Sequence, residues 1–245
     1  MIDKNKTPEE NKAKIVKNWL PRYTGMELDN FGKYILLVNF KHYIQSFAEH
    51  YGVKIYGEDK AMQAATYNDI TIINFGMGSA NAATVMDLLT AISPKACLFL
   101  GKCGSLKDKI PVGALLLPIG AIRGEGTSND YMPVEVPALP AFQLERAVSH
   151  VIKQYKQEYF SGTVYTTNRR VWEHDEDFKD YLTQIRSTAI DMETATIFVV
   201  GFKNEKDYEK FEFPQAIPLK LTVQDLLLEN AKEGNVQFKD GELKV

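Results

Sequence analysis

The sequence predicts an α/β fold in which a largely parallel sheet is covered by helices on both faces. Short apolar runs rich in β-forming residues alternate along the chain with segments that have helical spacing. The chain has 245 residues, 44% of them hydrophobic, so it can bury a sizeable core. We expect one domain after an N-terminal arm at residues 1–20. In open sheets of this class, ligands bind beyond the carboxyl ends of the strands.

The first half of the chain supplies three strands and two helices. Apolar runs predict strands at Tyr34–Phe40, Ile70–Phe75 and Ala96–Leu100, and helical spacing predicts helices at His42–His50 and Ala80–Ile92. Polar residues recur every third position in the second helix, which leaves an apolar face for the core. Each strand runs into a loop rich in small or polar residues.

The second half continues the alternation of strands and helices. A fourth strand is expected at Val112–Ile119, where Pro118 ends regular pairing or marks a sheet edge. Apolar residues at helical spacing predict helices at Leu144–Tyr155 and Phe178–Ile185. At Ala189–Thr196 an apolar strand gives way to a helix, so this junction is another candidate for a ligand site.

Composition and charge narrow the class of function. The formal net charge is −3 and the pI is near 5.9, which gives no electrostatic reason to expect nucleic acid. The polar N-terminus lacks a signal peptide's apolar core, and no apolar run is long enough to span a bilayer. We therefore expect a cytoplasmic protein with a small ligand. Cys97 and Cys103 are too few for a disulfide scaffold, and the four histidines suggest no metal set or catalytic triad.

Asp191, Met192 and Glu193 stand at the junction between the last apolar strand and its helix. A carboxylate there can accept hydrogen bonds from a vicinal diol while the thioether packs against a sugar ring. That combination suits ribose. Alternatively, Asp191 or Glu193 simply caps the helix, and spacing alone favours the cap.

Two glycine-containing loops are candidate anion sites. Gly76, Met77 and Gly78 bring backbone N–H groups to a helix N-terminus, although two glycines before a helix often form only a tight turn. Lys102 and Gly104 combine a cation with a flexible backbone, which suits a phosphate, although a lysine near a turn is usually solvated.

Two further loops carry charged and neutral hydrogen-bond donors. Phosphate recognition needs such a mixture, but a polar surface loop or a salt-bridged face has the same composition. The first loop is marked by Arg123, Glu125, Thr127 and Ser128. In the second, two aromatic side chains accompany the polar residues Asn168, Arg169 and Arg170, as would suit the phosphate and base of a nucleotide.

Five motifs occur in order at Asn74–Ser79, Phe99–Gly104, Arg123–Tyr131, Tyr165–Arg170 and Asp191–Thr196. They resemble the nucleoside phosphorylase and nucleosidase superfamily, most closely the short bacterial AMP nucleosidases, over about residues 18–202. The resemblance implies a three-layer α/β/α sandwich with a mixed, largely parallel central sheet, formed by a single domain over residues 21–245. It also implies a trimer or hexamer that hydrolyses AMP to adenine and ribose 5-phosphate without a metal or organic cofactor.

The resemblance also suggests roles for individual residues. Met192 and Glu193 would hold the ribose, with Glu193 as a catalytic group that accepts hydrogen bonds from its hydroxyls. The glycine-rich loops would surround the phosphate or the attacking water. Lys102 stands where many relatives carry a phosphate-binding arginine, a departure that suits water as nucleophile rather than inorganic phosphate. The candidates for the 5′-phosphate are Arg123, Thr127 and Ser128, with Arg169 or Arg170.

The C-terminal segment, from about residue 203, departs from the family pattern. Relatives place a Ser-Asp pair after the last main strand, and its aspartate donates to N7 of the base. Here Ala216–Val223 is a candidate strand and Asp225 a substitute acid, or else Asp225 caps a helix at Leu226–Leu228. Three functions stay open: an active AMP nucleosidase, an AMP-binding relative with weakened catalysis, and an enzyme acting on another nucleoside.

Overall fold

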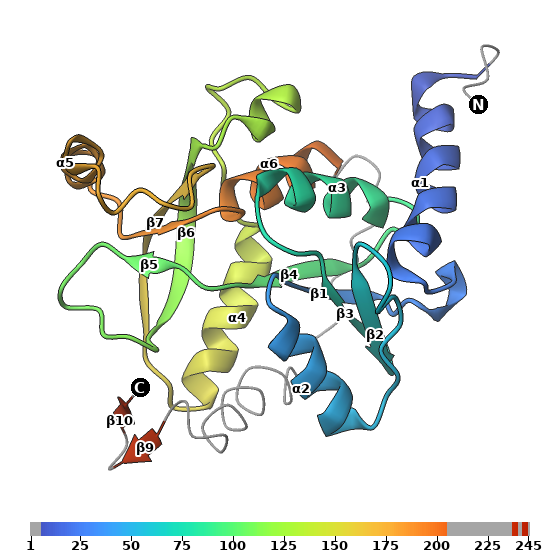
Figure 1. Ribbon diagram of the computed structural model, residues 1–245, viewed down its shortest axis with the longest axis horizontal. Coiled ribbons are helices and arrows are strands. Elements are labelled where there is room, and N and C mark those ends of the chain that lie inside the picture. The colour runs from blue at the N-terminus through green and yellow to red at the C-terminus, as the bar shows by residue number, and fades with distance from the viewer. Residues whose placement is uncertain (1–5, 205–236, 240–241, 245) are drawn as a thin grey trace. The chain divides into compact units, whose positions relative to one another are not determined.

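The computed structural model describes residues 6–204, 237–239 and 242–244 (Figure 1). The chain forms two compact units. The described part of the first unit comprises residues 6–101 and 200–204, and the second contains residues 102–199. Among the residues that the structure describes, no helix combines the length and the apolar character needed to cross a membrane.

The first unit begins with a long helix, α1 (Pro8–Thr24), whose start is fixed by a capping box. The Thr7 hydroxyl accepts a hydrogen bond from the Glu10 N–H at 3.2 Å, and the Glu10 carboxylate accepts one from the Thr7 N–H at 2.8 Å. The helix ends at Gly25, which has a φ of 67° and therefore lies in the left-handed region that glycine favours. Within the predicted arm the chain is therefore helical from Pro8, and the helix runs past residue 20 to Thr24.

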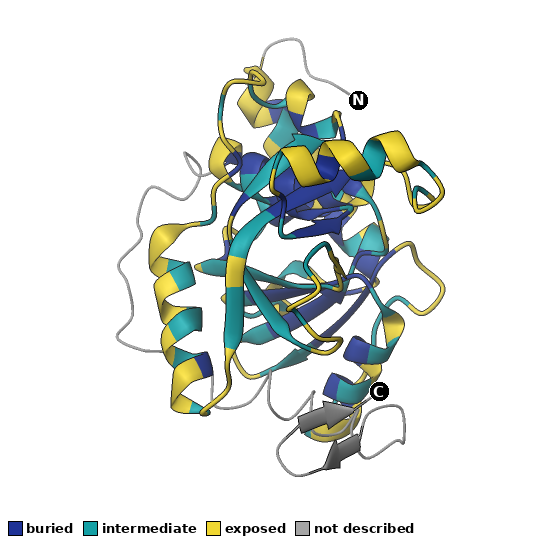
Figure 2. Ribbon diagram, turned by 90° about the vertical axis from the view of Figure 1, so that its left-hand side faces the viewer, coloured by how far each residue is buried: buried dark blue, intermediate teal, exposed yellow. Residues whose placement is uncertain are grey.

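A four-stranded mixed sheet forms the centre of the first unit, in the order β2-β3-β1-β4. Strand β1 is parallel to β3 and β4, whereas β2 is antiparallel to β3. Figure 2 shows the deep burial of the central strands, in which Leu37 and Ile72 have no exposed surface. The elements are β1 (Tyr34–Val38), α2 (Lys41–Tyr51), β2 (Gln63–Tyr67), β3 (Ile70–Asn74), α3 (Ser79–Leu89) and β4 (Ala96–Leu100), with a 3₁₀ turn, η1 (Leu28–Asn30).

The three strands and two helices predicted for this unit are therefore confirmed, with small differences at their ends. Strand β2 was not predicted, because its sequence Gln-Ala-Ala-Thr-Tyr has few of the β-branched and aromatic residues that mark strands. It pairs with β3 across a tight turn at Asn68, where φ is 51°. Asparagine tolerates that left-handed conformation better than most residues.

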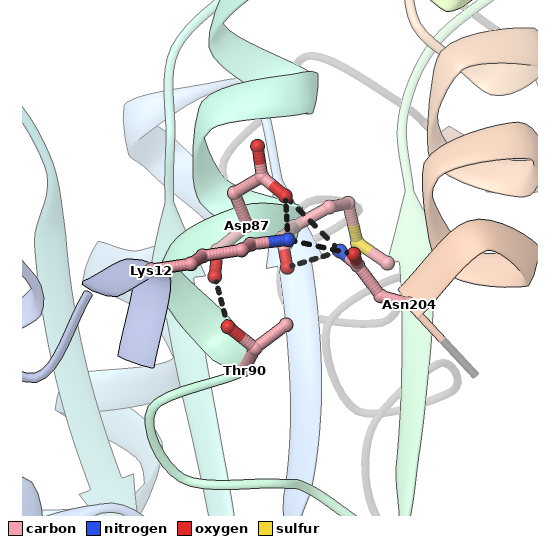
Figure 3. A network of polar contacts seen from close by, with 5 residues as sticks. Lys12, Asp87, Thr90 and Asn204 are labelled. Carbon is pink, nitrogen blue, oxygen red and sulfur yellow. Dashed lines mark hydrogen bonds and ion pairs between the residues drawn. The ribbon is translucent and has the colours of Figure 1, made fainter. Parts of the chain in front are cut away.

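A polar network joins two helices of this unit to Asn204, in the part of the chain after residue 199 that also belongs to this unit (Figure 3). The Lys12 ammonium donates to an Asp87 carboxylate oxygen at 2.8 Å and to the Asn204 amide oxygen at 2.9 Å. The buried Asn204 amide nitrogen in turn donates to the Met86 carbonyl at 3.3 Å. The network therefore fastens α1 and α3 to the end of α6 (Thr194–Asn204).

The second unit contains another four-stranded mixed sheet, in the order β5-β8-β7-β6. Strands β6, β7 and β8 are parallel, and β5 is antiparallel to β8. Figure 1 shows β6 and β7 as the long pair of this sheet. The elements are β5 (Gly104–Ser105), β6 (Leu115–Gly124), η2 (Thr127–Asp130), α4 (Phe142–Gln154), β7 (Tyr159–Thr167), α5 (Glu176–Gln184) and β8 (Ala189–Asp191), followed by α6 and the strands β9 (Gln237–Lys239) and β10 (Glu242–Lys244).

The fourth strand was predicted at Val112–Ile119, and both of these ends are wrong. Strand β6 begins at Leu115 and continues through Pro118 to Gly124, with a register irregularity between Pro118 and Gly120. Proline is tolerated there because β6 lies at the edge of its sheet, where one side of the strand needs no ladder hydrogen bonds. The edge alternative offered by the sequence is therefore the correct one, and the extension brings Arg123 into the strand.

Candidate active site

The carboxyl ends of three parallel strands meet at one edge of the second sheet. The register pairs Arg123 of β6 with Thr166 of β7, and Thr166 with Asp191 of β8. Each strand then runs into a loop or helix start that the sequence marks as a candidate site. The predicted residues that leave from this edge are Glu125, Thr127 and Ser128 after β6, Asn168, Arg169 and Arg170 after β7, and Met192 and Glu193 after β8.

The segment before β5 reaches the same edge from the opposite direction. Because β5 is antiparallel to β8, Gly104 pairs with Ile190, and the residues before Gly104 lie toward the carboxyl end of β8. Cys103 is exposed as a residue, but partial desolvation of its thiol, together with the nearby charge of Asp191, raises the pKa of the thiol to about 11. Cys103 is thus a neutral thiol near pH 7. Lys102, exposed and next in the chain, brings a positive charge to this edge.

Asp191 is the side chain that caps α6. One of its carboxylate oxygens accepts hydrogen bonds from the backbone N–H of Thr194 at 2.8 Å, the Thr194 hydroxyl at 2.5 Å and the Glu193 N–H at 3.3 Å. Burial raises the pKa of Asp191, and the hydrogen bonds from Thr194 and Thr166 oppose that shift. The capping alternative raised by the sequence therefore applies to Asp191.

Glu193 occupies a different position at the same helix start. Its backbone carbonyl accepts the first helical hydrogen bond, from the Ile197 N–H at 3.0 Å. Its side chain is only 1% exposed, whereas Met192 beside it is partly exposed. A carboxylate in water-poor surroundings interacts strongly with developing positive charge. The position suits stabilisation of a cationic sugar.

Thr166 is a buried residue of this edge that lies in the Tyr165–Arg170 motif but is not among the predicted site residues. Its hydroxyl donates to the second carboxylate oxygen of Asp191 at 2.7 Å and accepts the Ala195 N–H at 2.9 Å. The side chain has no exposed surface. Beyond its place in that motif, nothing in the sequence distinguishes Thr166 from an ordinary strand residue, because threonine is common in strands for its shape alone.

Glu125, predicted to bind substrate, is held within the protein. One carboxylate oxygen accepts the Thr196 hydroxyl at 3.1 Å, and the other accepts the Ser128 N–H at 3.2 Å. The residue is 4% exposed. Glu125 therefore ties the loop after β6 to the first turn of α6.

Arg123 uses its whole guanidinium group inside the protein. Nε donates to the Ser128 hydroxyl at 2.9 Å, and the two terminal nitrogens donate to the loop that follows. The remaining four acceptors are the carbonyls of Pro133 at 2.5 Å, Val136 at 2.8 Å and Met132 at 2.8 Å, and the Asn129 side-chain oxygen at 3.0 Å. An arginine has five N–H donors, so this arrangement engages all of them. In this geometry Arg123 organises the loop, and Ser128 is fully buried beneath it.

The two arginines after β7 have partners of their own. Arg169 donates to Asp175 at 2.8 Å, and its guanidinium lies 4.6 Å from the centre of the Phe178 ring. Arg170 pairs with Glu173 at 3.4 Å. Both arginines and Asn168 are exposed at the sheet edge, so a ligand can still reach them. The structure shows the salt-bridged face that the sequence offered as the alternative.

The loop at Gly76, Met77 and Gly78 belongs to the first unit, between β3 and α3. Gly76 has a φ of 81° and Gly78 a φ of 97°, so both positions favour glycine. Met77 between them is 44% exposed. The expected strand, turn and helix are therefore present. Asp225, together with the strand and the helix predicted on either side of it, lies outside the described residues.

The profile of the Phosphorylase superfamily matches residues 33–208. The chain belongs to this superfamily. The chain is similar to AMP nucleosidase from Bacteroides thetaiotaomicron VPI-5482, whose crystal structure superposes on it with a TM-score of 0.77. The two sequences are 61% identical, and the match covers 79% of this chain and 83% of the other. Uridine phosphorylase from Vibrio fischeri ES114 is 22% identical, with a TM-score of 0.66, over 74% and 75% of the two chains, and this likeness concerns the fold alone. The predicted nucleoside phosphorylase-like α/β fold is thus confirmed, with mixed strand pairing in two four-stranded sheets where one central sheet was predicted.

AMP nucleosidase from Escherichia coli K12 is a curated relative of this chain, and the two sequences are 25% identical over 235 residues. The match covers 77% of this chain but 49% of that protein. The chain spans about half the length of the curated AMP nucleosidases that it matches. The superfamily match ends at residue 208, before Asp225.

Proposed function

We propose that this superfamily member hydrolyses the N-glycosidic bond of AMP, giving adenine and ribose 5-phosphate. The observation that carries the proposal is the buried Glu193 beside Met192, at the carboxyl edge of three parallel strands. The 61% identity to a protein described as an AMP nucleosidase supports the choice of AMP.

The chemistry requires a group that stabilises positive charge on the sugar. As the bond between C1′ and N9 breaks, its electron pair moves into the adenine ring and the ribose gains oxocarbenium character. The Glu193 carboxylate stabilises this charge and accepts hydrogen bonds from the ribose hydroxyls. Water attacks C1′ and loses one proton, while adenine gains one at N7 and becomes a better leaving group.

The charged and polar residues around the sheet edge indicate which nucleophile is used and which groups bind the 5′-phosphate. Lys102 offers one positive charge where a phosphorylase needs strong recognition of inorganic phosphate. Thr127 is partly exposed, and Asn168, Arg169 and Arg170 are exposed. We assign the 5′-phosphate to donors among these residues, because the donors of Arg123 are already engaged.

The proposal predicts that purified protein releases adenine from AMP without added phosphate. Chromatography should detect adenine and ribose 5-phosphate in equal amounts, and adenosine should react more slowly. Release only when inorganic phosphate is present would instead indicate a phosphorylase. Binding of AMP without release would indicate a noncatalytic relative.

Asp225 is the proposed acid for N7, and its substitution tests that assignment separately. We expect Asp225→Asn to lower kcat for AMP by about 10²-fold, a typical contribution of general acid catalysis. Thermal unfolding should be measured in parallel, because loss of a helix cap would lower stability as well. Equal turnover by Asp225→Asn and the wild type would show that another group protonates the base.

A further inference from the structure

The hydroxyl of Thr166 connects strand β7 to the start of α6. It donates its one proton to Asp191 at 2.7 Å, because its other partner, the Ala195 N–H at 2.9 Å, can only donate. Thr166 has no exposed surface, so water cannot readily replace either hydrogen bond. One buried oxygen atom thus bonds to both sides of the β8–α6 junction.

Glu193 lies between these two contact points, two residues after Asp191 and two before Ala195. Its own backbone N–H donates to Asp191 at 3.3 Å. The backbone on both sides of Glu193 is therefore held by groups that Thr166 contacts, and this backbone determines where the Glu193 carboxylate is placed.

We propose that Thr166 is a positioning residue for Glu193, which it holds in register through Asp191 and the Ala195 N–H. This inference rests on the proposed function, because it assigns to Glu193 the stabilisation of the sugar. Replacement of the hydroxyl by a methyl group keeps the side chain's shape and leaves two buried polar groups without that partner. A misplacement of about 1 Å at a reacting centre can cost about 10²-fold in rate.

Thr166→Val is the direct test, and Thr71→Val is its matched control. Thr71 is also fully buried on a strand, accepts the Gly32 N–H at 2.7 Å and shares a second hydrogen bond with the Thr66 hydroxyl at 2.7 Å. Its hydrogen bonds all lie within the first unit and involve none of the proposed site residues. Both variants lose a buried hydroxyl with two partners, so both should lower Tm.

We expect Thr166→Val to lower kcat for AMP at least ten-fold while KM changes less than three-fold, and Thr166→Ser to recover most of the loss. Thr71→Val should keep kcat within two-fold when assayed well below its Tm. An unchanged kcat in Thr166→Val would overturn the inference. A Thr166→Ser variant as slow as Thr166→Val, or an equal loss in Thr71→Val, would also overturn it.

A second measurement separates this inference from the proposed function. If the wild type releases no adenine, the proposed hydrolysis is wrong, and calorimetric binding of ribose 5-phosphate then decides the role of Thr166. Affinity at least five-fold weaker in Thr166→Val than in Thr71→Val would support the positioning role. Equal affinities in the two variants, or no binding by the wild type, would overturn it.

Discussion

Glu193→Gln is expected to lower kcat for AMP hydrolysis by about 10²- to 10³-fold, the range found when one stabilising group of a transition state is removed. The amide keeps the shape of the side chain but removes the negative charge. Since the charge on the ribose develops only as the glycosidic bond breaks, the loss should fall on kcat more than on KM.

The stability of this variant is expected to change much less than its rate. The Asp191 carboxylate accepts the hydrogen bonds from Thr194 at the start of α6, and the substitution leaves these hydrogen bonds intact. Steady-state kinetics and thermal unfolding measure the two effects. Glu176→Gln is the control, because that side chain is 80% exposed on α5 and forms an ion pair with Lys179 at 2.8 Å, on the protein surface. A Glu193→Gln enzyme with wild-type turnover would remove Glu193 from the mechanism.

At the junction around Glu193, the sequence predicts the secondary structure but not the role of each carboxylate. The run from Ala189 predicts a strand that gives way to a helix, and it places two carboxylates at their boundary. It does not say which carboxylate caps the helix, because Asp191 and Glu193 are both near enough to its first N–H groups. The assignment depends on Thr166, which comes 25 residues earlier in the chain and fixes Asp191 from the neighbouring strand.

The sequence predicts where the candidate loops lie, but not which partners their side chains have. Parallel strands place their carboxyl ends together, and the motifs after β6, β7 and β8 do meet at one edge, although β7 itself was not predicted from the sequence. The partners of each side chain depend on contacts that the sequence does not specify. Glu125 looked like a ligand group, but it is bonded to Thr196, 71 residues later in the chain.

Arg123 presents the same difficulty, because three of its five acceptors are backbone carbonyls that reach it only when the loop after β6 folds back. Backbone carbonyls carry no sequence signature, so those of Met132, Pro133 and Val136 could not be predicted as its partners. The bridge between Ala121 and Ala138 closes the base of the same loop, with the Ala121 N–H donating at 2.8 Å. Arg123 therefore fastens the inside of a loop that is already closed at its base.

Arg123→Ala is consequently expected to lower the free energy of unfolding by about 2–4 kcal/mol, because hydrogen bonds to charged groups are among the stronger ones and several acceptors lose their donor together. Arg123→Lys should recover little of the loss, since an ammonium group cannot reproduce the planar fork of five donors. Urea denaturation of both variants measures the effect. Arg170→Ala is the matched control, because its side chain is 67% exposed and makes one ion pair, at 3.4 Å, so its midpoint should not change.

The same variants distinguish a loop-organising arginine from a phosphate ligand. A ligand role predicts that Arg123→Ala weakens AMP binding while the denaturation midpoint stays at the wild-type value. A loop-organising role predicts a lower midpoint, and it predicts that a phosphate-free ligand such as adenosine loses affinity by about the same factor as AMP. Because the loop also holds Glu125 against Thr196, its loosening would reach the first turn of α6 and affect every ligand that depends on Glu193.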